Sequence, residues 1–468
     1  MSKASIIGAY NTAFGAFVHK DKASGLITDT KTYYDLLIEA GRGAIADAGI
    51  EAKDIDAIYV GSCSPGSFIN QEHVAPIAAE IDPALRFKPM TRCECACASS
   101  SVALYDAIYA VEAGRAKHAL VIGVEKMNLL PTPQMTHVLS CCSHWPSEGS
   151  KGWSFPMLFA EYAKGYQAHY GIPTEQLEQM LWTVGALGYR NGAENPLAHV
   201  RNGPQTVAEI MKLNELDERG RSKNMMIAAP LRLHDCSLVS DGAAALVITA
   251  TSNVSNKARA VEIAGIGHSV ERLPENVRPN MHELMAGKDA AAKAYKEAGI
   301  KPADIDIVEL HDCFTINQIM SVEALGLSDD GRGGFDFLNG RYTRDDRVAV
   351  NLSGGLKAKG HPVGATGASM HTLIYKQLIG EPIGVAAKQA EIGVTSLAKR
   401  LGVAKSTVYR LASTLVAEGM LEQNPETERY RLGIALFGLG ALVRQRMNLS
   451  NEARPYIFDL RDATNEKS

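Results

Sequence analysis

One sixteen-residue segment of this chain occurs twice, and the repeat restricts the folds available to it. Residues 48–63 read AGIEAKDIDAIYVGSC, and residues 298–313, 250 positions later, read AGIKPADIDIVELHDC. Both copies hold a glycine that ends a helix, an Asp-Ile-Asp turn, a buried strand and a final cysteine. A spacing preserved over a helix end, a turn and a strand indicates a duplicated αβ unit. We therefore predict an α/β fold built from two related halves, each a sheet with helices.

The remaining patterns fit such a chain, with an insertion in its first half. Apolar periodicity predicts strands at residues 5–9, 55–61, 119–123, 243–250 and 307–310, and helices at 33–48, at 102–113 and from 314 onward. Residues 128–224 hold more Pro, Trp and Tyr and few clean strands, so we expect an inserted, mostly helical region covering a site, bounded at about 128–232. The expected domains are residues 1–256, 257–394 and 395–468.

Composition excludes several classes of protein. The 468 residues are 46% hydrophobic and 21% charged, which is ordinary for a soluble α/β protein. No run of eighteen apolar residues occurs, so we expect no membrane span, and the N-terminus lacks the architecture of a signal peptide. The eight cysteines suggest reduced thiols. We predict a cytoplasmic protein.

Three cysteines at alternate positions, Cys93, Cys95 and Cys97, precede a small-residue turn and a helix. Metal ligands usually come in spaced pairs with a second cluster elsewhere, so we predict no metal site here. An inert buried thiol suits Cys93 and Cys95. Cys97 lies at the strand-to-helix turn, where backbone N–H groups and the helix dipole lower a thiol pKa. It is the candidate nucleophile.

Two further polar groups lie in the second half. The strand at 307–310 delivers His311, Asp312 and Cys313 at its C-terminal end, where catalytic groups of α/β sheets gather. The segment NLSGGLKAKGHPVGATGAS at 351–369 places His361 in a glycine-rich loop whose backbone can approach a ligand closely. This loop has neither common phosphate-loop spacing, and His361 is a candidate general base.

Taken together, the motifs ACAS, VSDGAAALV, HDCF and GHPVGATG, in this order, resemble the thiolase superfamily, and HDCF resembles its sterol-carrier-protein type. The resemblance covers about residues 5–394. It implies a duplicated five-layer α/β fold, a homodimer or dimer of dimers, and acyl-CoA thioesters as substrates without a further cofactor.

The resemblance also implies a role for each matching residue. Cys97 would take the acyl group from a thioester, with His361 accepting its proton. His311 stands where commoner thiolases have an asparagine that positions a water, and Cys313 would move the α-proton of the incoming acyl-CoA. Claisen chemistry needs these two separate acid/base groups. The residues implied to contact the substrate are Ser237, at the pantetheine, and Gly364.

The thiolase pattern stops near residue 394. The glycine-rich loop and last strand expected after AEIGV are absent from the sequence, which predicts weakened catalysis. Instead, helices at 396–401 and 405–418, a turn at Gly402 and a hairpin at 421–432 form a helix-turn-helix pattern with a wing. An ordinary solvated helical hairpin is the alternative. The side chains placed to meet phosphates and base edges are those of Lys405, Ser406, Thr407, Tyr409 and Arg410.

From residue 395 to about 465 the chain resembles the IclR family of bacterial regulators, incomplete at both ends, and we interpret the whole as a fusion. Two functions follow. The first is a thiolase-like acyltransferase with a cysteine acyl-enzyme and an appended DNA-binding segment. The alternative is an IclR-type transcriptional regulator of double-stranded DNA, whose thiolase-derived body supplies a dimer and a sensor.

Overall fold

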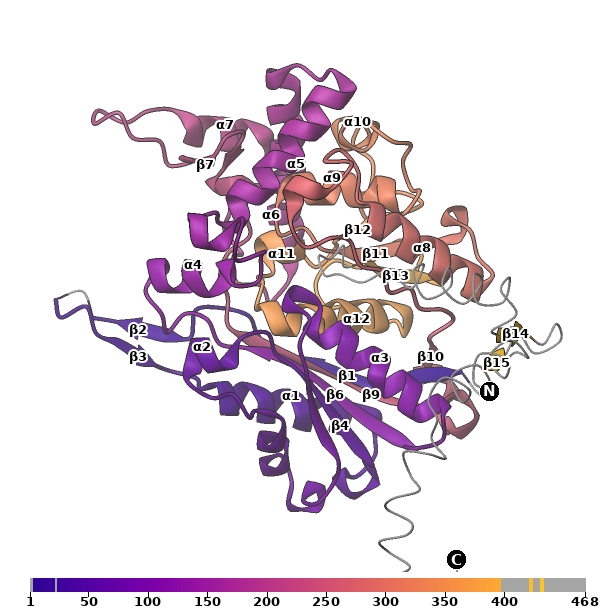
Figure 1. Ribbon diagram of the computed structural model, residues 1–468. Coiled ribbons are helices and arrows are strands. Elements are labelled where there is room, and N and C mark those ends of the chain that lie inside the picture. Colours follow the sequence, from indigo (N-terminus) through magenta and orange to yellow (C-terminus); the bar gives the residue numbers. More distant parts are fainter. Residues whose placement is uncertain (1–2, 22, 397–420, 424–429, 433–468) are drawn as a thin grey trace, which may run out of the picture. The chain divides into compact units, whose positions relative to one another are not determined.

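A computed structural model describes residues 3–21, 23–396, 421–423 and 430–432. The chain divides into two compact units, residues 1–402 and 403–468. The first unit contains a six-stranded and a three-stranded sheet, two short strand pairs and the helices around them (Figure 1). None of the helices in these described ranges is both long and apolar enough to cross a membrane.

The first sheet has six strands in the order β10-β1-β9-β6-β4-β5. Every residue of its two central strands, β6 (HALVIGVE) and β9 (GAAALVITA), is buried, as expected for continuous apolar runs with both faces covered. Strand β4 pairs in parallel with β5 and β6, whereas β9 is antiparallel to β6 and β1. The strands are β1 (Ala4–Asn11), β4 (Ala57–Gly61), β5 (Met90–Cys93), β6 (His118–Glu125), β9 (Gly242–Ala250) and β10 (Val261–Glu262).

The second sheet has the order β12-β11-β13, with β11 parallel to both neighbours. Its strands are β11 (Ile307–Leu310), β12 (Ala349–Val350) and β13 (Gly393–Ser396). The repeat predicted from the sequence is confirmed: Gly49 and Gly299 end the preceding helices with φ of 65° and 71°, and β11 follows its helix as β4 does. Because only glycine adopts this left-handed backbone without strain, both helices end at the same point.

Helices cover both sheets and complete five layers (Figure 1). Side chains alternate between the faces of a strand, so Leu120 and Ile122 pack with α1 while Ala119 and Val121 pack with α3 and α12. In the second sheet Val308 packs with α9. The helices of these layers are α1 (Tyr33–Ala48), α3 (Ser99–Glu112), α8 (Met285–Ala298), α9 (Thr315–Ala324) and α12 (Thr366–Leu378).

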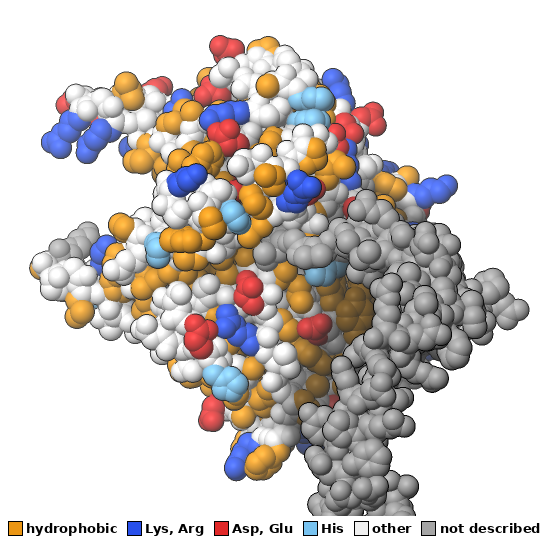
Figure 2. Space-filling view, in the orientation of Figure 1, with side chains coloured by type: hydrophobic (Ala, Val, Ile, Leu, Met, Phe, Trp, Pro, Cys, Tyr) orange, Lys and Arg blue, Asp and Glu red, His pale blue; other side chains and the backbone are white. Residues whose placement is uncertain are grey.

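Residues 128–232 form helices and one short strand pair. Helices α5 and α6 join the same hydrophobic cluster as α9 and the outer face of the second sheet. The elements are α4 (Thr132–Ser140), α5 (Phe155–Tyr170), α6 (Thr174–Glu194), α7 (Val207–Asn214), β7 (Met226–Ala228) and β8 (Leu231–Arg232). The first unit also contains three short helices and a hairpin: α2 (Pro65–Ile69), α10 (Gly333–Leu338), α11 (Gly355–Ala358), and β2 (Val18–Lys20) paired with β3 (Ile27–Asp29). Charged side chains of both signs are scattered over the face shown in Figure 2.

The two sheets differ beyond β6: among the described residues, the second sheet has no counterpart of β9, β1 or β10. In the first sheet β9 lies between β6 and β1. Strand β13 corresponds to β6, since each pairs in parallel with the strand of the repeat and follows the other parallel neighbour, β12 or β5, in the chain. Among the described strands none pairs with the other edge of β13, and a cavity of about 510 Å³ is lined there by β13, residues 260–269 and parts of α3, α8 and α12.

The structure describes little of the predicted helix-turn-helix segment. Strands β14 (Leu421–Gln423) and β15 (Tyr430–Leu432) pair antiparallel within the predicted hairpin. Ser396 was predicted to begin a helix; this is wrong, because its backbone pairs with Leu310 as the end of β13. The second predicted helix and all five candidate DNA-contacting residues lie outside the described residues.

A buried carboxylate ties the first sheet together at the end of β6. Asp241 is inaccessible to solvent and forms an ion pair with Lys126 at 2.9 Å. It also accepts hydrogen bonds from the backbone N–H groups of Phe17, Met127 and Asn128 at 2.7–3.1 Å. This carboxylate therefore links the β2–β3 hairpin, the end of β6 and the start of β9.

We predict that Asp241→Ala lowers the free energy of unfolding by about 3–5 kcal/mol, because it removes one partner of a buried ion pair. Urea denaturation followed by circular dichroism measures the loss. The control is Asp345→Ala, which removes an exposed carboxylate. A loss below about 1 kcal/mol in Asp241→Ala would show that the buried network is not a major source of stability.

Candidate active site

Cys97 lies in a strained turn between β5 and α3. The preceding residue, Ala96, has a φ of 41°. This left-handed conformation is energetically unfavourable for any residue that has a side chain. Hydrogen bonds hold the turn: Ser99 Oγ donates to the Ala96 carbonyl at 2.6 Å and accepts from the Cys95 N–H at 2.9 Å. Ala96 N–H donates to Glu94 Oε1 at 2.5 Å. The turn thus presents the half-buried thiol just before the N-terminus of α3, where the helix dipole favours a thiolate.

His361 is held as a neutral base. Its Nδ1 lies 2.7 Å from Thr366 Oγ1, and that hydroxyl donates its proton to the Pro362 carbonyl at 3.0 Å. The hydroxyl therefore accepts from Nδ1–H, and the lone pair of the ring is on Nε2. Burial lowers the pKa of His361 well below its usual value, and His311 and Lys359 lower it further. The ring stays unprotonated at neutral pH.

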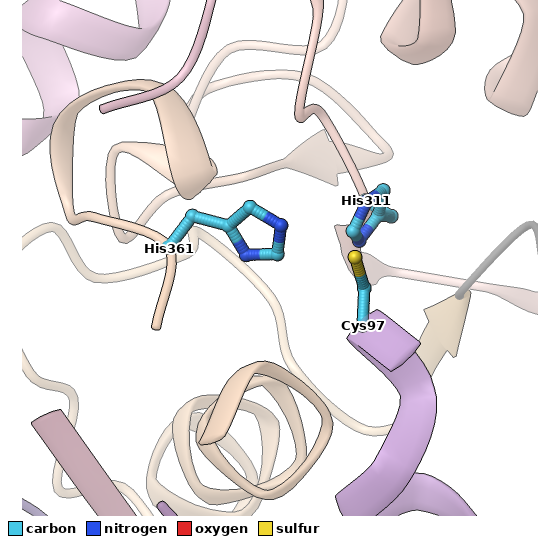
Figure 3. A group of neighbouring side chains, drawn as sticks. All are labelled: Cys97, His311 and His361. Atoms are coloured by element: carbon cyan, nitrogen blue, oxygen red, sulfur yellow. The ribbon is translucent and has the colours of Figure 1, made fainter. Parts of the chain in front are cut away.

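His311 completes a cluster with Cys97 and His361 (Figure 3). One donor atom from each of the three residues lies within 4.8 Å of the other two. The two imidazole rings are nearly perpendicular, with centroids 5.0 Å apart. The structure thus brings together the predicted nucleophile, the predicted base and a second histidine. They come from the short helical turn η4 (Ala96–Ala98), from the loop before α12 and from the end of β11.

Asp312 has a different task from its neighbours. Its carboxylate accepts hydrogen bonds from the backbone N–H groups of Leu356 and Lys357, at 2.7 and 3.3 Å, at the start of α11. Burial raises its pKa to about 7. A side chain at Gly355 would collide with this carboxylate, 2.1 Å away. The acid expected at the strand end therefore supports the glycine-rich loop from behind.

Cys313 is buried beside the cluster without being part of it. Burial raises the pKa of its thiol well above the usual value, and the nearby Cys97 and Asp312 raise it further. The Cys313 carbonyl accepts a hydrogen bond from the Ser237 N–H at 2.8 Å, so half-buried Ser237 lies next to this strand end. The acid/base role of Cys313 and the pantetheine contact of Ser237 stay predictions.

Gly364 packs against Glu125, a residue that the sequence analysis did not single out. Gly364 N–H donates to Glu125 Oε2 at 3.1 Å, and a Cβ on Gly364 would lie 2.6 Å from that oxygen and from the Val124 carbonyl. Close packing explains this glycine, while its predicted contact with substrate stays untested. Glu125 also accepts from the Cys63 N–H at 2.6 Å and from Ser62 Oγ at 3.2 Å. The sequence feature that could have identified Glu125 is an acidic residue at the end of an otherwise apolar strand.

Glu125 is completely buried, and burial raises its pKa from 4.5 to about 7. The folded protein therefore holds a proton here that the unfolded chain has lost, so this group's contribution to stability falls as pH rises from about 4.5 to about 7. We predict that the free energy of unfolding of Glu125→Gln, relative to that of the parent protein, rises by about 3 kcal/mol between about pH 4 and pH 8. Each pKa unit corresponds to about 1.4 kcal/mol.

Urea denaturation of both proteins across this pH range measures the difference. The matched control is Glu175→Gln, which alters an exposed glutamate. A free-energy difference between Glu125→Gln and the parent that stays constant with pH would contradict the raised pKa.

Comparison with known proteins agrees with this geometry. The profile of "Thiolase, N-terminal domain" matches residues 4–184, and that of "Thiolase C-terminal domain-like" matches residues 267–409. The chain is 37% identical to the acetyl-CoA acetyltransferase of Methanothermobacter thermautotrophicus, an alignment that covers 84% of this chain and 96% of that protein. It is 28% identical to human sterol carrier protein 2, covering 82% of this chain and 68% of that protein.

Solved structures share the fold at lower identity. The Ltp2-ChsH2(DUF35) aldolase superposes with a TM-score of 0.65 at 20% identity, covering 81% of this chain and 91% of that one. The acetyl-CoA acetyltransferase from Syntrophomonas wolfei gives a TM-score of 0.55 at 19% identity, with 81% and 93% covered.

Proposed function

The chain belongs to the thiolase family and is an acyltransferase, and we propose that it transfers an acyl group from an acyl-CoA to a carbon acceptor through a thioester on Cys97. One observation carries this proposal. The Cys97 thiol lies with His311 and His361 in one cluster, and His361 presents Nε2 as a base because Thr366 holds the proton on Nδ1.

In the first half-reaction, His361 Nε2 takes the proton of the Cys97 thiol as sulfur attacks the acyl-CoA carbonyl. The tetrahedral intermediate then collapses: the bond to the CoA sulfur breaks, and His361 returns the proton to the departing thiolate. The products are a Cys97 thioester and free CoA. The turn at Cys97 can offer its own backbone N–H to the developing oxyanion.

In the second half-reaction, the Cys313 thiol first loses its proton to solvent, and the thiolate then removes the α-proton of the acceptor, an acyl-CoA in the simplest case. The resulting carbanion attacks the Cys97 thioester and a carbon–carbon bond forms. Cys97 leaves as a thiolate, which takes up a proton from solvent and returns to the thiol. We assign to His311, which lies beside Cys97 and His361, a hydrogen bond to the oxygen of the acceptor thioester while negative charge develops there. Because burial raises the pKa of Cys313, its thiolate is a strong base once formed.

The names of the relatives suggest acetyl-CoA as the acyl donor. Ser237 and Gly364 remain our candidates for substrate contact, and a homodimer or dimer of dimers is the assembly we propose. We also keep the domain division at 256/257 and 394/395, in which the second half lacks its last strand and glycine-rich loop. That truncation is expected to reduce catalysis.

A DNA-binding role for residues 395–468 is the second candidate. The observation in its favour is the antiparallel pair of β14 and β15, which lies within the expected wing. None of the comparisons supports it, and the proposed contacts of Lys405 to Arg410 rest on the sequence alone. Binding to duplex DNA that weakens steeply with salt would be its signature.

We predict that incubation with acetyl-CoA adds one acetyl group to the protein, located by peptide mapping to Cys97. Cys97→Ala should show no adduct, because the nucleophile is gone. Cys313→Ala should still be acetylated but should form no condensation product, since only the second half-reaction uses Cys313. A folded protein that takes up no acetyl group would refute the proposed acyl-enzyme.

We further predict that Thr366→Val slows acetylation of Cys97 about five- to tenfold, because it removes a hydrogen bond worth about 1 kcal/mol that fixes the tautomer of His361. Quenched-flow mass spectrometry gives the rate. The conservative variant Thr366→Ser keeps the hydroxyl and should retain most of the parent protein's acetylation rate. Equal rates in the Val and Ser variants would show that Thr366 has only a packing role.

A further inference from the structure

We propose that Cys97, His311 and His361 form a site for a thiophilic divalent cation such as Zn²⁺, which reversibly caps the nucleophile and inhibits the enzyme. A thiolate with two imidazoles is a ligand set that Zn²⁺ favours. Three protein ligands leave one tetrahedral position for water or another small ligand. Metal binding does not depend on the proposed acyl transfer; the inhibition does.

The distances within the cluster fit such a site. One donor atom from each of the three side chains lies within 4.8 Å of the others. Zn–S bonds of about 2.3 Å and Zn–N bonds of about 2.0–2.1 Å in a tetrahedron place the donors about 3.4–3.6 Å apart. Each pair of donor atoms therefore needs to approach by at most about 1.4 Å. Rotation of the half-buried Cys97 side chain supplies part of this movement.

The contacts that hold the three side chains in place also suit a metal site. Zinc-bound histidines commonly donate their other ring N–H to an oxygen that fixes the ring, and Thr366 Oγ1 accepts from His361 Nδ1 in that way. The three ligands come from both halves: Cys97 precedes α3, His311 follows β11, and His361 lies in the buried glycine-rich loop before α12. His311 and His361 are both buried, which limits competition from water.

This site differs from the cysteine cluster considered in the sequence. The Cys93 thiol donates to Asp106 at 3.3 Å, away from the two histidines, and takes no part. The chain offers one competing set of thiols, because Cys63 and Cys142 have their sulfurs 3.6 Å apart and Cys141 is exposed beside them. Replacing Cys141 and Cys142 leaves Cys63 without its thiol neighbour, so the test starts from that double variant.

Binding and acylation exclude each other. The Cys97 thiol loses its proton to solvent when the sulfur–metal bond forms, no electrons are exchanged, and the sulfur lone pair is then no longer available to attack a thioester. Removal of the metal by a chelator restores the free thiol. We therefore expect inhibition that follows metal occupancy and is fully reversible.

The experiment uses the full chain with Cys141→Ser and Cys142→Ser, titrated with Co²⁺ as a spectroscopic probe for Zn²⁺. We expect one Co²⁺ per chain, intense visible bands of a tetrahedral site and a sulfur-to-cobalt charge-transfer band, all displaced by Zn²⁺. Adding Cys97→Ala should abolish the charge-transfer band. Adding His311→Ala or His361→Ala should weaken binding at least about tenfold, and Thr366→Val about tenfold.

The control is Cys236→Ser in the same background. It removes a buried thiol that donates a hydrogen bond to the Arg232 carbonyl, and it should leave the spectrum unchanged. Circular dichroism verifies that each variant folds. A charge-transfer band that persists in Cys97→Ala, or Co²⁺ affinity that is unaltered by both histidine variants, would overturn the proposal. Normal Co²⁺ binding without any acetylation of Cys97 would instead leave the metal site standing and refute the proposed acyl transfer.

Discussion

The close approach of two helix N-termini over the first sheet is the constraint on which the candidate active site depends. Helix α3 follows Cys97 and α12 follows the His361 loop, and they meet at Ser100 and Gly367. A Cβ at Gly61 would lie 2.3 Å from Ser100 Cα, and one at Gly123 would lie 2.7 Å from the Ser100 side chain. Ser100 Oγ accepts from the Ala368 N–H at 2.9 Å and so joins the two helices. Small residues at these points allow residues of the two halves to reach a common site.

The sequence predicts what is local or repeated. The repeat at 48–63 and 298–313 contains its own helix end, turn and strand, so it was sufficient to predict two related sheets. The apolar runs of β6 and β9 identified buried strands without further information. Cys97 and His361 stood out because a turn and a glycine-rich loop are visible in the sequence.

Tertiary contacts determine what the sequence left out. Nothing in HDCF indicates that Asp312 turns toward α11 while His311 faces Cys97, because α11 lies 44 residues further along the chain. Glu125 reaches Gly364 over a separation of 239 residues, and its role follows only from that contact. The tautomer of His361 likewise depends on how the hydroxyl of Thr366 is used, which a residue type alone does not specify.

The two halves also show why the catalytic cluster is asymmetric. The first half has its antiparallel strand β9 beside β6, whereas the equivalent edge of β13 borders a cavity in the described structure. Cys97 lies on the complete half, where buried carboxylates at Glu125 and Asp241 fix the loops around it. His311 and His361 come from the half with the cavity, and their positions rest on the glycine-rich loop and on Asp312 behind it. The proposed nucleophile is therefore anchored by the first sheet, while His311 and His361 depend on the packing of the loop, and a change in the second half should disturb the proposed proton transfer before it disturbs the position of the thiol.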